Sequence, residues 1–143
     1  MRPRQLFEPL LASVSRQERA ELLAGAAELA SPIFDPAQLG AEGDADSSLA
    51  MLHGLFWLTA NLTGSRPVLL AIDDLHWCDP SSLRGLAYLL PRMEGLPLLT
   101  VVGLRPAEPG ADPALLRRIT TDPLATVVRP GALSAEATGE LMR

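Results

Sequence analysis

The sequence predicts an α/β fold: a small parallel sheet of about three strands, packed in three layers with five or six helices. Two observations carry this prediction. Val68 to Ile72 and Pro97 to Leu104 are uninterrupted apolar runs, typical of strands buried on both faces of a parallel sheet. The segment between them is long enough for a helix. The three segments therefore predict a right-handed βαβ unit with neighbouring parallel strands.

The composition sets limits on the class of protein. A chain of 143 residues that is 48% apolar can bury the core of one globular domain. No apolar run is long enough to span a membrane, and the N-terminus lacks the apolar core of a signal peptide. Cys78 is the single cysteine, which fits a cytoplasmic protein. The net charge of −5 and the scattered basic residues predict no direct DNA binding.

The N-terminal part of the chain predicts two helices. Apolar side chains along one face predict the first helix from Arg4 to Val14, and Pro9 marks either a kink or the first turn. The capping box S-R-Q-E at Ser15 predicts a second helix that runs to about Ala30 and ends at Ser31. Its inward side chains are predicted to be Ala20, Leu23, Ala24 and Ala27.

The next stretch predicts a loop and a buried helix. Ile33 to Asp46 is rich in acids, Pro and Gly, as in an exposed loop. The helix should run from Ser48 to about Asn61, and it is apolar on most sides. His53 and Trp57 lie four residues apart on it. They could contact a base or ligand, but core packing explains them better.

The first apolar strand ends in two adjacent acids, Asp73 and Asp74. Ligands of α/β proteins bind at the carboxyl ends of the strands, and carboxylates at a buried strand end need a partner or a metal. In one interpretation this is a Walker B segment, where Asp73 holds Mg²⁺ and Asp74 polarises the water that attacks a γ-phosphate. In the other, the two acids cap the following helix. These residues alone support both equally.

The second half of the βαβ unit places an arginine beside those acids. Asp79 and Pro80 are a strong helix start, and Gly95 ends that helix. The second strand ends in Arg105, which should share the sheet edge with the acid pair. An arginine there can neutralise transition-state charge on a phosphate, or it can simply pair with an acid. The side chains predicted to face inward from the helix are Leu83, Leu86, Ala87, Leu90 and Met93.

The C-terminal part predicts short elements, and one residue type is missing throughout. Asp112 and Ser134 are helix caps, and Thr126 to Arg129 predicts a third strand. The sequence contains no lysine. A phosphate-binding loop of the form G-x-x-x-x-G-K-[ST] needs one, so these residues cannot form that loop.

The segment V-L-L-A-I-D-D-L-H-W-C-D-P-S-S-L-R-G-L-A-Y-L-L resembles the Walker B region of AAA/STAND-type ATPase domains. These domains occur in large bacterial LuxR-family transcriptional regulators with a MalT-like plan. R-Q-L-F-E-P-L-L, M-L-H-G-L-F-W-L, V-V-G-L-R-P and L-S-A-E-A are similar to further parts of the same domain. The resemblance implies a partial P-loop NTPase fold of the ASCE type without its first two strands. Residues 1–66 would be its helical N-terminal segment, and residues 67–143 its Walker B and sensor-1 half.

The resemblance also implies a function, namely binding of ATP and Mg²⁺ as a regulatory switch. Asp73 would be the Mg²⁺-associated acid, Asp74 the water-activating acid and Arg105 the sensor, so that all three contact the nucleotide site. His76 and Trp77 match the family's H-W positions. Without the phosphate-binding loop, the resemblance implies a truncated ATPase fragment that is inactive alone and binds neither ATP nor Mg²⁺ tightly.

Three alternatives stay open from the sequence. A metal site built from His76, Cys78 and Asp79 is a weaker idea, because residues so close in a helix-entry turn seldom face one point. The chain could instead be a degenerate, non-catalytic module that forms a homo-oligomer or binds a full-length relative through an open sheet edge. It could also be a remnant without function.

Overall fold

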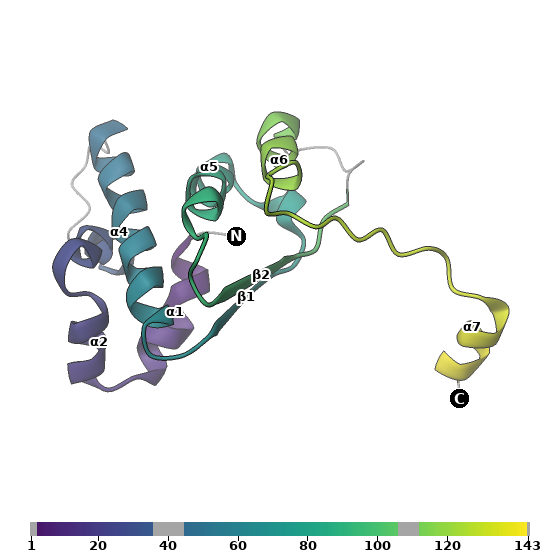
Figure 1. Cartoon of the computed structure of the whole chain (residues 1–143), viewed down its shortest axis with the longest axis horizontal. Helices are drawn as coiled ribbons and strands as arrows, with labels where there is room; N and C mark the ends of the chain where they lie inside the picture. The colour runs from purple at the N-terminus through teal and green to yellow at the C-terminus, as the bar shows by residue number, and fades with distance from the viewer. Residues whose placement is uncertain (1–2, 36–44, 106–111, 143) are drawn as a thin grey trace.

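A computed structural model describes residues 3–35, 45–105 and 112–142 of the chain (Figure 1). In these ranges helices precede, separate and follow two strands, and η denotes a short 3-10 helix. The elements are α1 (Pro3–Ser13), α2 (Arg16–Leu22), η1 (Gly25–Ala30), α3 (Ser31–Phe34), α4 (Ala45–Thr63), β1 (Val68–Ile72), η3 (Leu75–Trp77), α5 (Pro80–Leu89), η4 (Leu90–Arg92), β2 (Leu98–Val102), α6 (Pro113–Thr120) and α7 (Ala135–Leu141).

The predicted pair of neighbouring parallel strands with a helix between them in the chain is confirmed. Strands β1 and β2 pair in parallel, with Val68 opposite Leu98 and Ile72 opposite Val102, and α5 lies between them in the chain. Asp79 begins α5, because its carboxylate accepts the backbone N–H of Ser82 and so satisfies one of the free N–H groups of the first turn.

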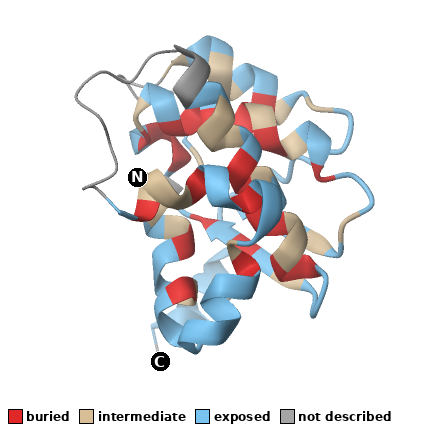
Figure 2. Ribbon diagram, turned by 90° about the vertical axis from the view of Figure 1, so that its left-hand side faces the viewer, coloured by how far each residue is buried: buried red, intermediate tan, exposed pale blue. Residues whose placement is uncertain are grey.

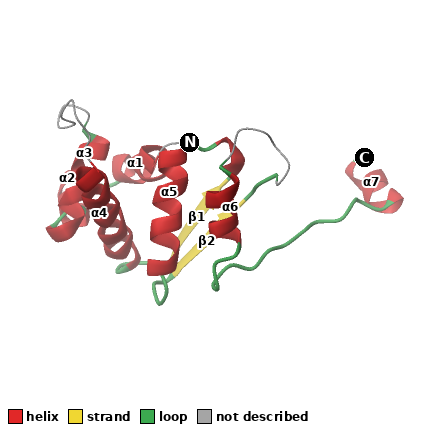
Figure 3. Ribbon diagram, turned by 90° about the horizontal axis from the view of Figure 1, so that it is seen from above, coloured by secondary structure: helices red, strands yellow, loops and turns green. Residues whose placement is uncertain are grey.

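Helices cover one face of the β1–β2 sheet (Figures 1 and 3). On that face Leu70 and Ile72 are 8% and 2% exposed, and they share a buried cluster with residues of α5 and with Ile119 of α6. On the other face Leu69 and Leu99 are 63% and 62% exposed. The predicted three layers are therefore wrong for the part of the chain that the structure describes, since nothing in it covers this second face.

The predicted third strand at Thr126 to Arg129 is also wrong. No strand is assigned there, and Val127 and Val128 are exposed. Figure 1 shows this part of the chain running away from the body towards α7. A β-prone segment forms a strand only where it has a partner edge and a surface to pack on, and here it lies against neither. Helix α7 is present as predicted, and its N-cap is Ser134.

The predicted second helix is divided into shorter pieces. Helix α2 ends at Leu22, and Gly25 adopts a left-handed backbone with φ +63°, which an α-helix cannot contain. Ser31 begins α3 instead of ending a helix. Of the predicted inward side chains, Ala27 is buried and Leu23 half-buried, whereas Ala20 and Ala24 are exposed.

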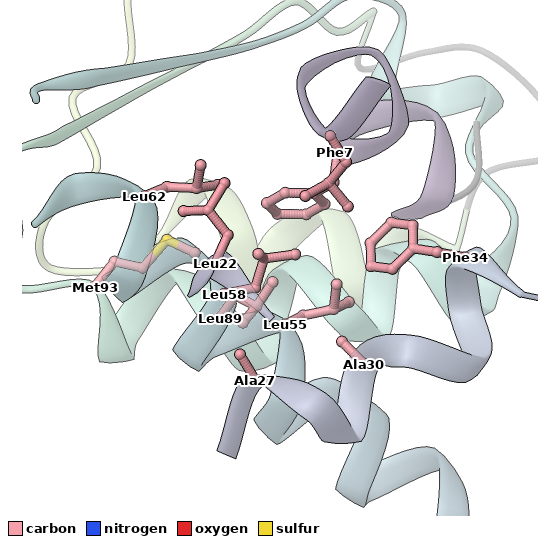
Figure 4. Packing of buried hydrophobic residues seen from close by; sticks show 11 residues of the cluster. Phe7, Leu22, Ala27, Ala30, Phe34, Leu55, Leu58, Leu62, Leu89 and Met93 are labelled. Carbon is pink, nitrogen blue, oxygen red and sulfur yellow. The ribbon is translucent and has the colours of Figure 1, made fainter. Parts of the chain in front are cut away.

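The N-terminal elements form a second buried cluster against α4 (Figure 4). Gly54 lets two backbones approach closely, because a Cβ added to it would lie only 2.3 Å from the backbone nitrogen of Ala30. The figure labels ten of the buried side chains, which are Phe7, Leu22, Ala27, Ala30, Phe34, Leu55, Leu58, Leu62, Leu89 and Met93.

Two expectations about this region are corrected. His53 and Trp57 do not pack in the core: both are exposed, and the Trp57 indole donates to Nε2 of His53 at 3.0 Å. Most of the predicted 33–46 loop, residues 36–44, lies outside the described ranges, and Ile33 belongs to α3.

Pro9 lies inside α1. Figure 2 shows buried residues on the facing sides of the helices, and no helix in the described ranges has the length and apolarity to cross a membrane.

Candidate functional site

The ends of β1 and β2 are joined beyond the last paired residues. The N–H of Gly103 donates to the carbonyl of Ile72 at 2.8 Å, and the N–H of Leu75 donates to the carbonyl of Gly103 at 2.9 Å. These two bonds hold the chain after β1 against the chain after β2. The parallel register consequently places three residues at the same edge of the sheet, namely Asp73, Asp74 and Arg105.

Asp73 lies against Gly103 on the uncovered side of the sheet. Side chains alternate between the two faces of a strand, so Asp73 follows the exposed residues Leu69 and Ala71. A Cβ added to Gly103 would lie 2.7 Å from Oδ1 of Asp73. Because Gly103 has no side chain, the Asp73 carboxylate can occupy this space. Its Oδ1 also accepts the backbone N–H of Asp74 at 2.9 Å.

Asp74 occupies a conformation that is uncommon for its residue type. Its φ and ψ are 52° and 48°, and it is the only non-glycine residue with a positive φ in the described ranges. Such left-handed residues carry strain and occur often at functional sites. The turn directs the chain into η3 and leaves the Asp74 side chain 54% exposed.

The residues after the acid pair return to the interior. Leu75 is fully buried, and the side chain of His76 is 1% exposed. Nδ1 of His76 accepts the backbone N–H of Arg105 at 3.2 Å, and Nε2 lies 3.7 Å from Oδ1 of Asp74. Sequence reasoning singled out His76 without finding this role. The only signal was a histidine two positions after the acid pair.

The alternative metal site at the helix entry does not form. Asp79 is engaged as the N-cap of α5, and Cys78 is buried. No three His, Cys, Asp or Glu side chains in the described part of the chain are grouped so that they could hold a metal ion. This finding does not exclude binding of Mg²⁺ at Asp73, because protein sites often hold Mg²⁺ through one or two carboxylates, with water molecules as the remaining ligands.

Asp79 has the clearest electrostatic perturbation near the site. Partial burial on its own raises the pKa of this carboxyl, but hydrogen bonds from the hydroxyl and backbone N–H of Ser82 outweigh it. The net effect is a lowered pKa, since these donors favour the charged carboxylate.

The chain matches no protein-family model, no curated protein and no solved structure. The resemblance to AAA/STAND-type ATPase domains is therefore one of sequence segments alone.

Proposed function

We propose that this chain contributes the Mg²⁺-associated and water-activating half of an ATP-binding switch domain. The observation that carries the proposal is the meeting of the strand ends, where the acid pair after β1 lies beside the chain that leads to Arg105. The D-D-L-H-W-C-D segment of the sequence supports the same assignment. The domain would belong to a cytoplasmic, LuxR-family bacterial transcriptional regulator of the AAA/STAND type.

Each residue has a chemical role in this proposal. Asp73 faces the uncovered side beside Gly103, where a hydrated Mg²⁺ bound to ATP has room to approach. Asp74 is exposed and would polarise the water that attacks the γ-phosphate. Arg105 would neutralise charge as it develops on the transferred phosphoryl group.

These 143 residues do not supply the other half of such a site. Without a lysine there is no loop of the G-x-x-x-x-G-K-[ST] type, whose backbone amides cradle the phosphates. We therefore expect the isolated chain to bind Mg²⁺ and ATP weakly and to hydrolyse none. The phosphate cradle would come from another polypeptide segment.

The test uses Mn²⁺ with ATP as a paramagnetic probe of the isolated chain. We expect Mn²⁺ to broaden the NMR signals of residues 73–75 and 103–105 first, and Asp73→Asn to abolish this selectivity. Glu94→Gln removes an exposed acid in the turn before β2 and serves as the control. Broadening that spreads evenly over the acidic surface would contradict the proposal. ATP turnover that Asp73→Ala abolishes would contradict the expected inactivity.

A second candidate function is favoured by the uncovered sheet face. Leu69, Leu99 and Val101 are exposed on it, and Val127 and Val128 are exposed on the extended C-terminal segment. An apolar face and an apolar extended segment on one chain can cover each other between two copies. In this alternative the chain is a non-catalytic homo-oligomeric module. The same domain of a full-length relative could replace the second copy of the chain.

Light scattering distinguishes this second function. A dimer at micromolar concentration that Val101→Asp converts to a monomer would support it. A well-folded monomer at all concentrations would contradict it.

A further inference from the structure

The imidazole of His76 lies beneath the candidate site with one nitrogen unsatisfied. Its Nε2 is buried and has no hydrogen-bond partner among the described residues. A buried polar atom without a partner costs free energy, and such atoms are few in native proteins. The position of this nitrogen therefore needs a physical reason.

The contact of the other ring nitrogen fixes the proton. Nδ1 accepts the backbone N–H of Arg105, so it carries no hydrogen of its own. A neutral imidazole has one donor and one acceptor nitrogen. The proton consequently lies on Nε2, which makes the unsatisfied atom a donor.

The Asp74 carboxylate is an acceptor that lies close to this donor. Nε2 and Oδ1 of Asp74 are 3.7 Å apart, slightly beyond hydrogen-bond length, and a small side-chain rotation or a bridging water would join them. Asp74 is half exposed, so its second oxygen can face solvent at the same time.

We propose that His76 is a positioning residue that aims the Asp74 carboxylate and ties it to the chain after β2. Nδ1 of its ring accepts the backbone N–H of Arg105, and Nε2–H on the other side of the ring is available as a donor to Asp74. A ligand that draws Asp74 outward would thereby alter the contact that holds the backbone at Arg105. The relevance of this contact to ATP binding rests on the proposed function, but the contact between His76 and Asp74 does not.

The first measurement is the tautomer of His76 in the full chain, by long-range ¹H–¹⁵N NMR at neutral pH. We expect the Nε2–H form, and the Nδ1–H form would overturn the proposal. We expect Asp74→Asn to shift the Nε2 signal, and the matched variant Asp73→Asn to leave it in place. An Nε2 signal that does not respond to Asp74→Asn would also overturn the proposal.

Two substitutions separate the two contacts of the ring. In His76→Asn the amide oxygen replaces Nδ1 as acceptor, so Arg105 should keep its amide protection while the Asp74 carboxyl ¹³C signal moves. In His76→Gln the amide nitrogen replaces Nε2, so the Asp74 signal should stay near its original place. The Arg105 amide should then exchange about fivefold to tenfold faster, the factor for one lost net hydrogen bond.

The Asp73 carboxyl signal is the internal control and should move in neither variant. A general loosening of the turn would move both carboxyl signals together and would overturn the proposal. If neither variant folds, the tautomer and the response to Asp74→Asn still decide. None of these signals requires nucleotide or metal, so a failure of Mn²⁺ and ATP to bind would contradict the proposed function alone.

Discussion

The two faces of the β1–β2 sheet are equally apolar in sequence but differ in what covers them. Leu70 and Ile72 face helices, whereas Leu69 and Leu99 face solvent. Alternate residues of one five-residue strand thus have opposite environments. An apolar run in the sequence therefore shows which faces of a strand can be buried. Which of these faces is buried depends on the elements that pack against the strand.

The same difference continues into the candidate site. The uncovered face leads to Asp73, which lies beside Gly103 where a ligand can reach it. The interior side leads to the buried Leu75 and His76. Asp73, which is assigned to metal binding, and His76, which is assigned to positioning, are therefore on different sides of one short turn.

The largest expected effect compares truncations on the two faces. We expect Ile72→Ala to lower the free energy of unfolding by about 2–5 kcal/mol, because it removes buried contacts and leaves a cavity. Leu69→Ala removes the side chain of an exposed neighbour and should cost less than about 0.5 kcal/mol. Urea denaturation at low protein concentration measures both. Equal losses would show that the exposed face is covered in solution.

This contrast also explains how far the sequence predicted the structure. Asp79, Asp112 and Ser134 cap the helices as predicted, because an N-cap acts on neighbouring backbone groups. The apolar pattern likewise identified β1 and β2. The three layers and the strand at Thr126 to Arg129 failed, because each requires a covering element that local pattern does not reveal.

The arrangement of residues at the candidate site was predictable to a similar extent. The parallel strands bring Asp73, Asp74 and Arg105 to one edge, as the βαβ pattern required. The contact between His76 and Arg105 spans 29 residues and depends on how the turn after β1 folds back. The left-handed Asp74 that produces this turn has no sequence signal beyond the tolerance of Asp for that conformation.

The next largest effect concerns the helix that covers the packed face. Asp79→Ala should lower the free energy of unfolding by about 1 kcal/mol, because α5 loses its N-cap. Asp79→Asn should retain most of that stability, since an amide oxygen can accept the same N–H. Thermal or urea unfolding of the three proteins at neutral pH measures this. An Asn variant as unstable as the Ala variant would contradict the capping role.

The charge of the cap adds a pH dependence with a definite sign. The pKa of Asp79 is lowered from 3.8 in the folded chain, so its charged form stabilises the fold at pH values above 3.8. This contribution is lost as the pH falls through the lowered pKa. Wild type should therefore lose stability on acidification more than Asp79→Asn does. Parallel profiles of unfolding free energy against pH would contradict this.

A smaller effect is expected where the uncovered face meets the acid pair. In Gly103→Ala the new methyl group would displace the Asp73 carboxylate, which can rotate away because it is the end of a flexible side chain. We expect a loss of about 1 kcal/mol or less, but a clear weakening of Mn²⁺ broadening at residues 73–75. Gly131→Ala is the matched control, since nothing lies within 4 Å of its added Cβ. Unchanged broadening in Gly103→Ala would remove Asp73 from the metal site.

The smallest effect is expected at Asp74. Asp74→Gly relieves a left-handed conformation. It also removes the carboxylate that lies 3.7 Å from Nε2 of His76 and gives the unfolded chain more freedom. Because these effects oppose each other, the free energy of unfolding should change by less than about 0.5 kcal/mol. Asp73→Gly is the comparison, and it should cost about 1 kcal/mol because the bond to the Asp74 N–H is lost. Urea unfolding measures both. A large loss in Asp74→Gly would mean that the contact with Nε2 of His76 stabilises the turn by more than the left-handed conformation of Asp74 costs.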